Sequence, residues 1–178
     1  MGVAPENNNS YTENVQIASP IQSDPIVCII DSGIQEMHKY LESAILHDDS
    51  MSLLPNNSSV SDEVTGGGHG TRVTGAVLYP STIPTSGVYQ LPCWIRNMRI
   101  LDENNCLPED VYPPKAIAIA VQKYNINNPF PTKIFNHSIG SHRSCELKHM
   151  TSWAAELIVS LTITIFCSYR RQEIFPQM

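Results

Sequence analysis

Short apolar runs separated by polar loops dominate the pattern of this chain, and the first of them begins just after Pro25. Ile26 to Ile30 are five consecutive apolar residues, and Asp31-Ser32-Gly33 follows them directly. Such a run, bounded by turn residues, is typical of a short strand buried on both faces. Residues 93–101 alternate in part, and residues 133–140 end in a glycine turn. Both are therefore predicted as further strands.

Three other stretches have the composition or spacing of helices. Residues 69–78 are mostly small or β-branched and include Gly75, and an internal glycine costs a helix roughly 1 kcal/mol against alanine. A helix of this kind is expected to need its backbone close to something, so we predict one packed deep in the fold. Residues 115–124 follow two prolines and place apolar residues three to four apart, which predicts a second helix of about ten residues. A third is predicted from near Glu146 to about Leu157.

This alternation of strand, helix, strand, helix, strand and helix predicts an α/β fold with a parallel sheet and crossover helices. Residues 1–24 are polar and rich in Asn, Ser and Pro, so we expect a loose N-terminal tail. Residues 35–65 are predicted to be mostly loop. The segment after Pro80, with Pro84 and Gly87, is predicted to be another loop.

Two interpretations remain open for the apolar stretch at residues 157–167. It is shorter than the ~20 apolar residues that span a membrane, and its alternation of Ile and Thr favours a strand that completes the sheet. Alternatively, the reading frame or the gene changes near Leu157. The domain would then run from 25 to 157, with residues 158–178 as a divergent tail. A sheet left incomplete in this way would expose an apolar edge, which favours aggregation.

Composition and charge narrow the class of protein. The chain has 178 residues, of which 42% are hydrophobic, enough for one domain with its own core. A net charge of −6 without a basic stripe argues against a nucleic-acid partner. Five cysteines without a C-x-x-C pair favour reduced thiols. Because the N-terminus has neither a basic start nor an apolar segment, we expect no signal peptide, no membrane association and a cytoplasmic location.

Two residues are candidates for chemistry. Asp31 ends the first buried strand, at the edge where α/β folds place their sites, although a turn-forming Asp before Ser-Gly is the simpler interpretation. His69 follows three glycines at the start of a predicted helix, where it can reach a reacting group. A lone histidine is also compatible with a structural role. Four other residues could bind a metal, but solvated loop residues are the favoured interpretation of them: His38, His47, Asp48 and Asp49.

Together these motifs resemble those of the subtilisin-like serine proteases, the subtilases. In chain order Asp precedes His, as in the subtilisin triad, where Ser comes last. Ile30–Ile34 resembles the aspartate motif of the family, and Gly68–Gly75 resembles its histidine motif. Met98–Asp102 looks like the core strand that follows, and Asn136–Gly140 looks like the Asn-x-Ser-x-Gly strand that lines the substrate cleft. From about residue 25 to 157 the chain resembles the N-terminal part of the catalytic domain.

The resemblance implies a serine-type endopeptidase that acts on peptide or protein substrates. His69 would be the general base, and Asp31 would accept a hydrogen bond from its far ring nitrogen. Ser138, Ile139 and Gly140 would offer backbone groups to an extended peptide. Ser138 is not the nucleophile in this alignment, and a strand residue without a chemical role fits it equally well. No cofactor is implied, and no carboxylate cluster is assignable to the calcium sites of the family.

The serine of the family is missing from these 178 residues. Neither the Gly-Thr-Ser-Met-Ala motif nor the Ala-Gly-Asn turn that supplies an oxyanion donor has a match, and Thr151–Ala154 is only a partial lookalike. Loss of the nucleophile costs about 10⁶ in turnover, so we expect no triad hydrolysis by this sequence alone. The alternatives are a triad-incomplete module that binds peptides or a partner, a non-functional gene fragment, and a metal hydrolase that uses Asp31, His69 and another histidine.

Overall fold

A parallel sheet forms the centre of the computed structural model, which describes residues 14–66, 68–139, 152–161 and 165–168. The strands of this sheet lie in the order β3-β5-β2-β6-β7, and every neighbouring pair is parallel. Their bounds are Ile26–Asp31 (β2), Met51–Ser52 (β3), Trp94–Arg99 (β5), Ile134–His137 (β6) and Ile165–Ser168 (β7). Because β2 is the central strand, its last residue, Asp31, lies in the middle of the carboxyl edge of the sheet.

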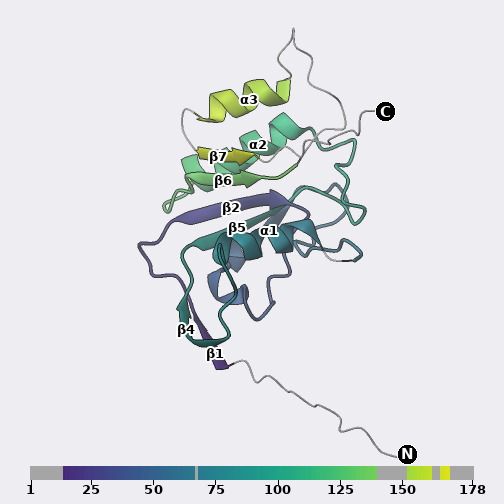
Figure 1. The fold of residues 1–178 in the computed structure, drawn as a ribbon. Helices are drawn as coiled ribbons and strands as arrows, with labels where there is room; N and C mark the ends of the chain where they lie inside the picture. Colours follow the sequence, from purple (N-terminus) through teal and green to yellow (C-terminus); the bar gives the residue numbers. More distant parts are fainter. Residues whose placement is uncertain (1–13, 67, 140–151, 162–164, 169–178) are drawn as a thin grey trace, which may run out of the picture.

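Helices cover both faces of this sheet (Figure 1). Helix α1 (His69–Leu78) lies on one face, and α2 (Pro113–Val121) and α3 (Ser152–Leu161) lie on the other. A π-helical turn at Gln122–Ile126 continues α2. The predicted α/β class, a parallel sheet with crossover helices, is confirmed.

The two-sided cover explains the apolar run in β2. Val27 and Ile29 pack into the core cluster that includes Leu78 of α1. Cys28 and Ile30 pack into the cluster that includes α2. Since successive side chains of a strand point to opposite faces, both sets must be apolar when both faces are buried.

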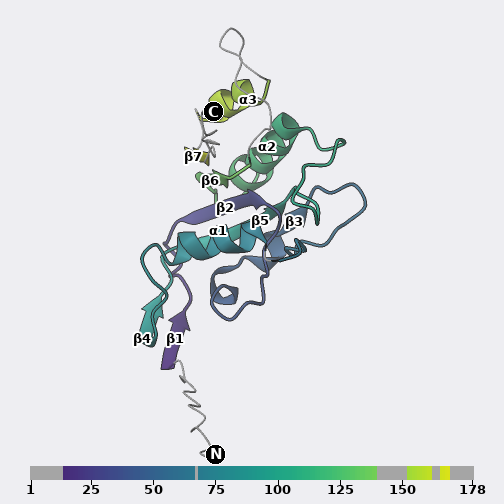
Figure 2. The same cartoon turned by 45° about the vertical axis from the view of Figure 1, so that its right-hand side comes forward.

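A second, two-stranded parallel sheet corrects two predictions. Strand β1 (Asn14–Ala18) pairs with β4 (Ser86–Gln90), and Figure 2 shows the pair beyond the end of the main sheet. The expectation of a loose tail is therefore wrong for β1, and the expectation of a loop after Pro80 is wrong for β4. Each strand obtains its backbone hydrogen bonds from a segment distant in sequence, which no local pattern reveals. Residues 1–13 lie outside the described residues.

The C-terminal elements differ in extent from the prediction. Residues 140–151 lie outside the described part, so the predicted helix start near Glu146 is among them. Helix α3 continues past Leu157 to Leu161, and Ile165–Ser168 then forms β7, which pairs with β6. The strand predicted within 157–167 is thus present only at its end, where it extends the sheet.

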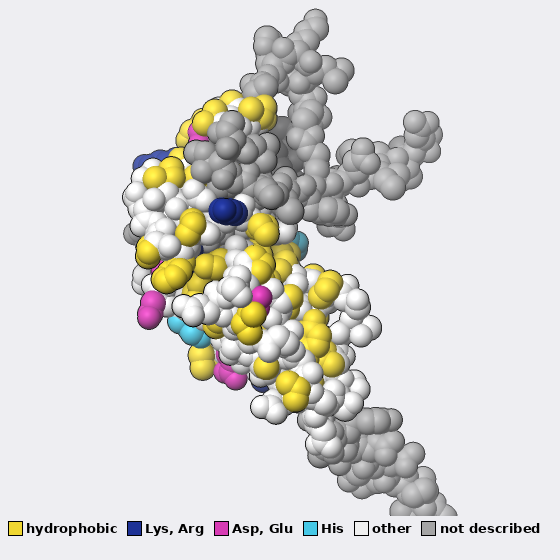
Figure 3. Space-filling view, turned by 90° about the vertical axis from the view of Figure 1, so that its left-hand side faces the viewer, with side chains coloured by type: hydrophobic (Ala, Val, Ile, Leu, Met, Phe, Trp, Pro, Cys, Tyr) yellow, Lys and Arg dark blue, Asp and Glu magenta, His cyan; other side chains and the backbone are white. Residues whose placement is uncertain are grey.

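Helix α3 has exposed apolar side chains. Figure 3 shows hydrophobic side chains at this end of the described part of the molecule, beside an acidic one. Ile158 and Val159 of α3 are 51% and 62% exposed. No helix in the described ranges is long and apolar enough to cross a membrane.

Candidate active site

Asp31 and His69 lie in direct contact at the carboxyl edge of the sheet. Asp31 is the last residue of β2 and His69 the first of α1, and Nδ1 of His69 is 2.8 Å from Oδ2 of Asp31. An ionised carboxylate can only accept, so Nδ1 carries the proton and donates it. The second carboxylate oxygen, Oδ1, accepts a hydrogen bond of 2.7 Å from the backbone N–H of Ser32. The structure thus brings together the two residues on which the sequence analysis placed its candidate chemistry.

The two side chains differ sharply in exposure. The Asp31 side chain is 1% exposed, whereas that of His69 is 44% exposed. The hydrogen bond that His69 donates to Asp31 raises the pKa of His69, partial burial opposes this, and the charges of Asp31 and Asp62 add to the increase. In the neutral ring this tautomer leaves the lone pair on Nε2, in a half-exposed side chain. The arrangement can therefore accept a proton from a group in solvent or in a bound ligand.

Glycines allow α1 to come this close to β2. A Cβ on Gly70 would lie 2.2 Å from the carbonyl oxygen of Gly33 and 3.1 Å from Cβ of Asp31. Gly33 itself has a φ of +97°, in the region that favours glycine. The expectation of a close backbone approach is confirmed at Gly70. It is wrong at Gly75, where an added Cβ would meet nothing within 4 Å.

The sequence pattern does not indicate the role of Asp62. This residue is only 4% exposed, and its carboxylate accepts hydrogen bonds from the hydroxyls of Ser32, at 3.1 Å, and Thr71, at 2.9 Å. It lies in a polar loop, where an aspartate predicts only a turn. A capping aspartate is ordinarily recognised directly before a helix, but Asp62 precedes the α1 start by several residues, so the usual signal is absent.

The predicted substrate strand is described in part. Ser138 directly follows β6, the neighbour of β2, so it lies at the same edge of the sheet as Asp31. Its hydroxyl donates a hydrogen bond of 2.6 Å to Oδ1 of Asn136. Ile139 packs against the core cluster that includes α2. Gly140 lies outside the described residues.

The structure does not support the alternative metal sites in the described part of the chain. There, no three His, Cys, Asp or Glu side chains are grouped so that they could hold a metal ion. Two of the loop candidates have protein partners instead: His47 contacts Glu36 at 2.9 Å, and Asp49 contacts Arg96 at 2.7 Å.

Comparison with known families extends the resemblance along almost the whole fold. The subtilase family model matches residues 22–169. This chain belongs to the subtilase family. No match was found among curated proteins. The subtilase match continues past residue 157 and includes β7, so the last strand of the sheet belongs to the matched region. Serine-type peptidase chemistry is the function associated with the subtilase family.

The glycines of this subtilase give a matched pair of variants. Gly70→Ala forces a Cβ against the backbone of Gly33 and is expected to destabilise the fold by about 1–3 kcal/mol or more. Gly75→Ala has open space and improves helix propensity, so we expect it to stabilise by about 0.5–1 kcal/mol. Denaturant unfolding of both variants measures the difference. Equal effects would contradict the close approach of α1 to β2.

Asp31→Asn is expected to lower the pKa of His69, because the hydrogen bond to the carboxylate is the main cause of its increase. A pKa raised above the unfolded value near 6.5 means that the folded state binds the proton more tightly. The pair therefore stabilises the fold fully below about pH 6.5, and this contribution is lost as the pH rises through the folded pKa. The stability advantage of the wild type over Asp31→Asn should thus shrink with rising pH.

NMR titration of the His69 ring protons and unfolding curves at several pH values test both statements. Asp48→Asn, an exposed aspartate in a 3₁₀ turn, is the control and should leave the His69 midpoint unchanged. An unchanged midpoint in Asp31→Asn would show that the two side chains do not pair in solution.

Proposed function

We propose that Asp31 and His69 are the acid–base half of the Asp-His-Ser system of a subtilisin-like serine endopeptidase. The observation that carries the proposal is the 2.8 Å hydrogen bond between a buried aspartate and a half-exposed histidine. Nε2 of His69 would take the proton of a serine hydroxyl and return it to the leaving amine. Asp31 would hold the required tautomer and stabilise the imidazolium that forms.

The substrate in this proposal is an extended segment of a peptide or protein. Ser138, Ile139 and Gly140 would pair with it through their backbone groups, as an added strand. The position of Ser138 just after β6, at the edge that carries Asp31, supports this role. The Ile139 side chain packs on the core, so it is the backbone of this residue that would face the substrate.

The nucleophile and the oxyanion donor must come from sequence other than these 178 residues. We propose that further codons of the same gene encode them. An oxyanion donor contributes about 10² to 10³ in turnover, and the serine about 10⁶. The 178-residue chain is therefore expected to be inactive by the triad mechanism.

A triad-incomplete module that binds peptides or a partner is the second candidate, and a non-functional gene fragment is the third. The absence of a Gly-Thr-Ser motif from the sequence supports both. The module is favoured over the fragment by the assembled Asp31–His69 pair, since the structure forms this pair without the serine.

A cytoplasmic location also belongs to this proposal. The three cysteines in the described part, Cys28, Cys93 and Cys106, are free. Burial raises the pKa of the Cys93 thiol to about 11. Free thiols of this kind are usual in a reducing compartment.

A fluorophosphonate probe separates these candidates. The gene should be read downstream of codon 157 in all three frames, and any frame that encodes the Asn and Gly-Thr-Ser motifs should be joined to the chain. The extended protein is expected to react with the probe, and its His69→Ala variant and the 178-residue chain are expected not to react. If no frame restores the motifs, or if the extended protein stays unlabelled, the endopeptidase proposal is wrong. Binding of a peptide library by the 178-residue chain would then support the module.

A further inference from the structure

We propose that Asp62 is a positioning residue for the Asp31–His69 pair. Its single buried carboxylate holds the segment that follows Asp31 and the segment that follows His69. The proposal deepens the proposed function and rests on it for the role of the pair, while the contacts themselves do not depend on any activity.

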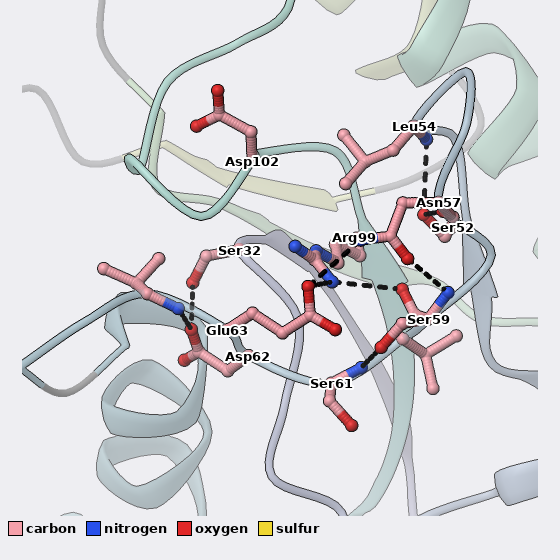
Figure 4. A network of polar contacts seen from close by, with 12 residues as sticks. Ser32, Ser52, Leu54, Asn57, Ser59, Ser61, Asp62, Glu63, Arg99 and Asp102 are labelled. Atoms are coloured by element: carbon pink, nitrogen blue, oxygen red, sulfur yellow. Dashed lines mark hydrogen bonds and ion pairs between the residues drawn. The ribbon is translucent and has the colours of Figure 1, made fainter.

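One oxygen of Asp62 fixes the Asp31 side of the pair. The hydroxyl of Ser32 donates to Oδ1 of Asp62 at 3.1 Å, and Figure 4 shows this hydroxyl directed at the carboxylate. The backbone N–H of Ser32 in turn donates to Oδ1 of Asp31 at 2.7 Å. The same Ser32 hydroxyl accepts a hydrogen bond of 2.9 Å from the N–H of Gly70. Ser32 thereby links Asp62 to both Asp31 and the first turn of α1.

The other oxygen fixes the His69 side. Oδ2 of Asp62 accepts hydrogen bonds from the backbone N–H of Thr71, at 3.1 Å, and from its hydroxyl, at 2.9 Å. Thr71 is in the first turn of α1, where backbone N–H groups have no partner within the helix. A negative charge at this end is also favoured by the helix dipole. Asp62 therefore sets where α1 begins, and His69 is its first residue.

The site is shaped for a carboxylate. A Cβ on Gly68 would lie 1.6 Å from the Asp62 carboxylate, so the glycine leaves the space that this group fills. Each oxygen accepts from a different segment, and an amide would present a donor to one of them. Asp62→Asn therefore loses the hydrogen bonds at one of the two oxygens, and Asp62→Ala loses those at both.

Charge and position are two separable effects of Asp62 on His69. The Asp62 charge adds to the increase in the pKa of His69, while the Arg72 charge on α1 opposes it. Positioning acts through Ser32, because Ser32 holds the second oxygen of Asp31. Ser32→Ala removes the hydrogen bond between Ser32 and Asp62 and keeps the charge of Asp62. This variant therefore tests the positioning effect alone.

The experiment is an NMR titration of His69 in the full 178-residue chain and its Asp62→Asn, Ser32→Ala and Glu63→Gln variants. We expect a lower His69 pKa in Asp62→Asn and also in Ser32→Ala, though not as low as in Asp31→Asn. Glu63→Gln is the matched control, because the neighbouring carboxylate points to Arg99, 3.0 Å away, and should leave the midpoint unchanged (Figure 4). A residue with only a structural role would change stability without moving this midpoint.

Three outcomes would overturn the proposal. A pKa that falls in Asp62→Asn and stays at the wild-type value in Ser32→Ala would show that Asp62 acts by charge alone. A pKa that is unchanged in both, while Asp31→Asn lowers it, would leave Asp62 a structural role only. If Asp62→Asn does not fold, the Thr71→Val and Thr71→Ser variants replace it, and the proposal requires a lower His69 midpoint in Thr71→Val only. The third outcome that overturns the proposal is then a midpoint that falls in both Thr71 variants or in neither. An unlabelled extended protein, by contrast, overturns the endopeptidase proposal and leaves the Asp62 contacts unaffected.

Discussion

The close approach of the first turn of α1 to the end of β2 is the constraint on which this site depends. It sets the 2.8 Å contact between Asp31 and His69, and it is possible because Gly33 and Gly70 meet without a Cβ between them. A larger residue at Gly70 would separate the two elements without any change to Asp31 or His69. Asp62 then completes the junction with hydrogen bonds to both sides, so the geometry of the pair is a property of the backbone as much as of the two side chains.

Features with local signals were predictable from the sequence. The apolar run of β2 and the turn residues after it placed Asp31 at a strand end, and the glycines before His69 placed that residue at a helix start. The order of Asp before His and the resemblance to the subtilase motifs then predicted that Asp31 and His69 form a pair. Parallel topology followed from the alternation of elements, because parallel neighbours need a crossover between them.

Features that depend on distant partners were not predictable. Strands β1 and β4 are short segments of mixed polar and apolar residues, and each obtains its backbone partners only from the other. Asp62 becomes a buried carboxylate only because Ser32 and Thr71 converge on it from elements far apart in the sequence. At Gly75 the sequence predicted a contact that is absent. The glycine-containing composition of residues 69–78 suggested a close approach there, but the space around Gly75 is open.

This chain assembles the Asp31–His69 pair by itself, without the serine that the pair would serve. The most direct measurement is the proton resonance of His69 Nδ1–H in ¹⁵N-labelled protein. A proton held between an imidazole and a carboxylate is protected from exchange and shifted far downfield. We expect such a signal in the 178-residue chain and its loss in Asp31→Asn. A folded chain that lacks the signal would show that the pair does not form in solution, and a signal that remains in Asp31→Asn would show that it does not come from this pair.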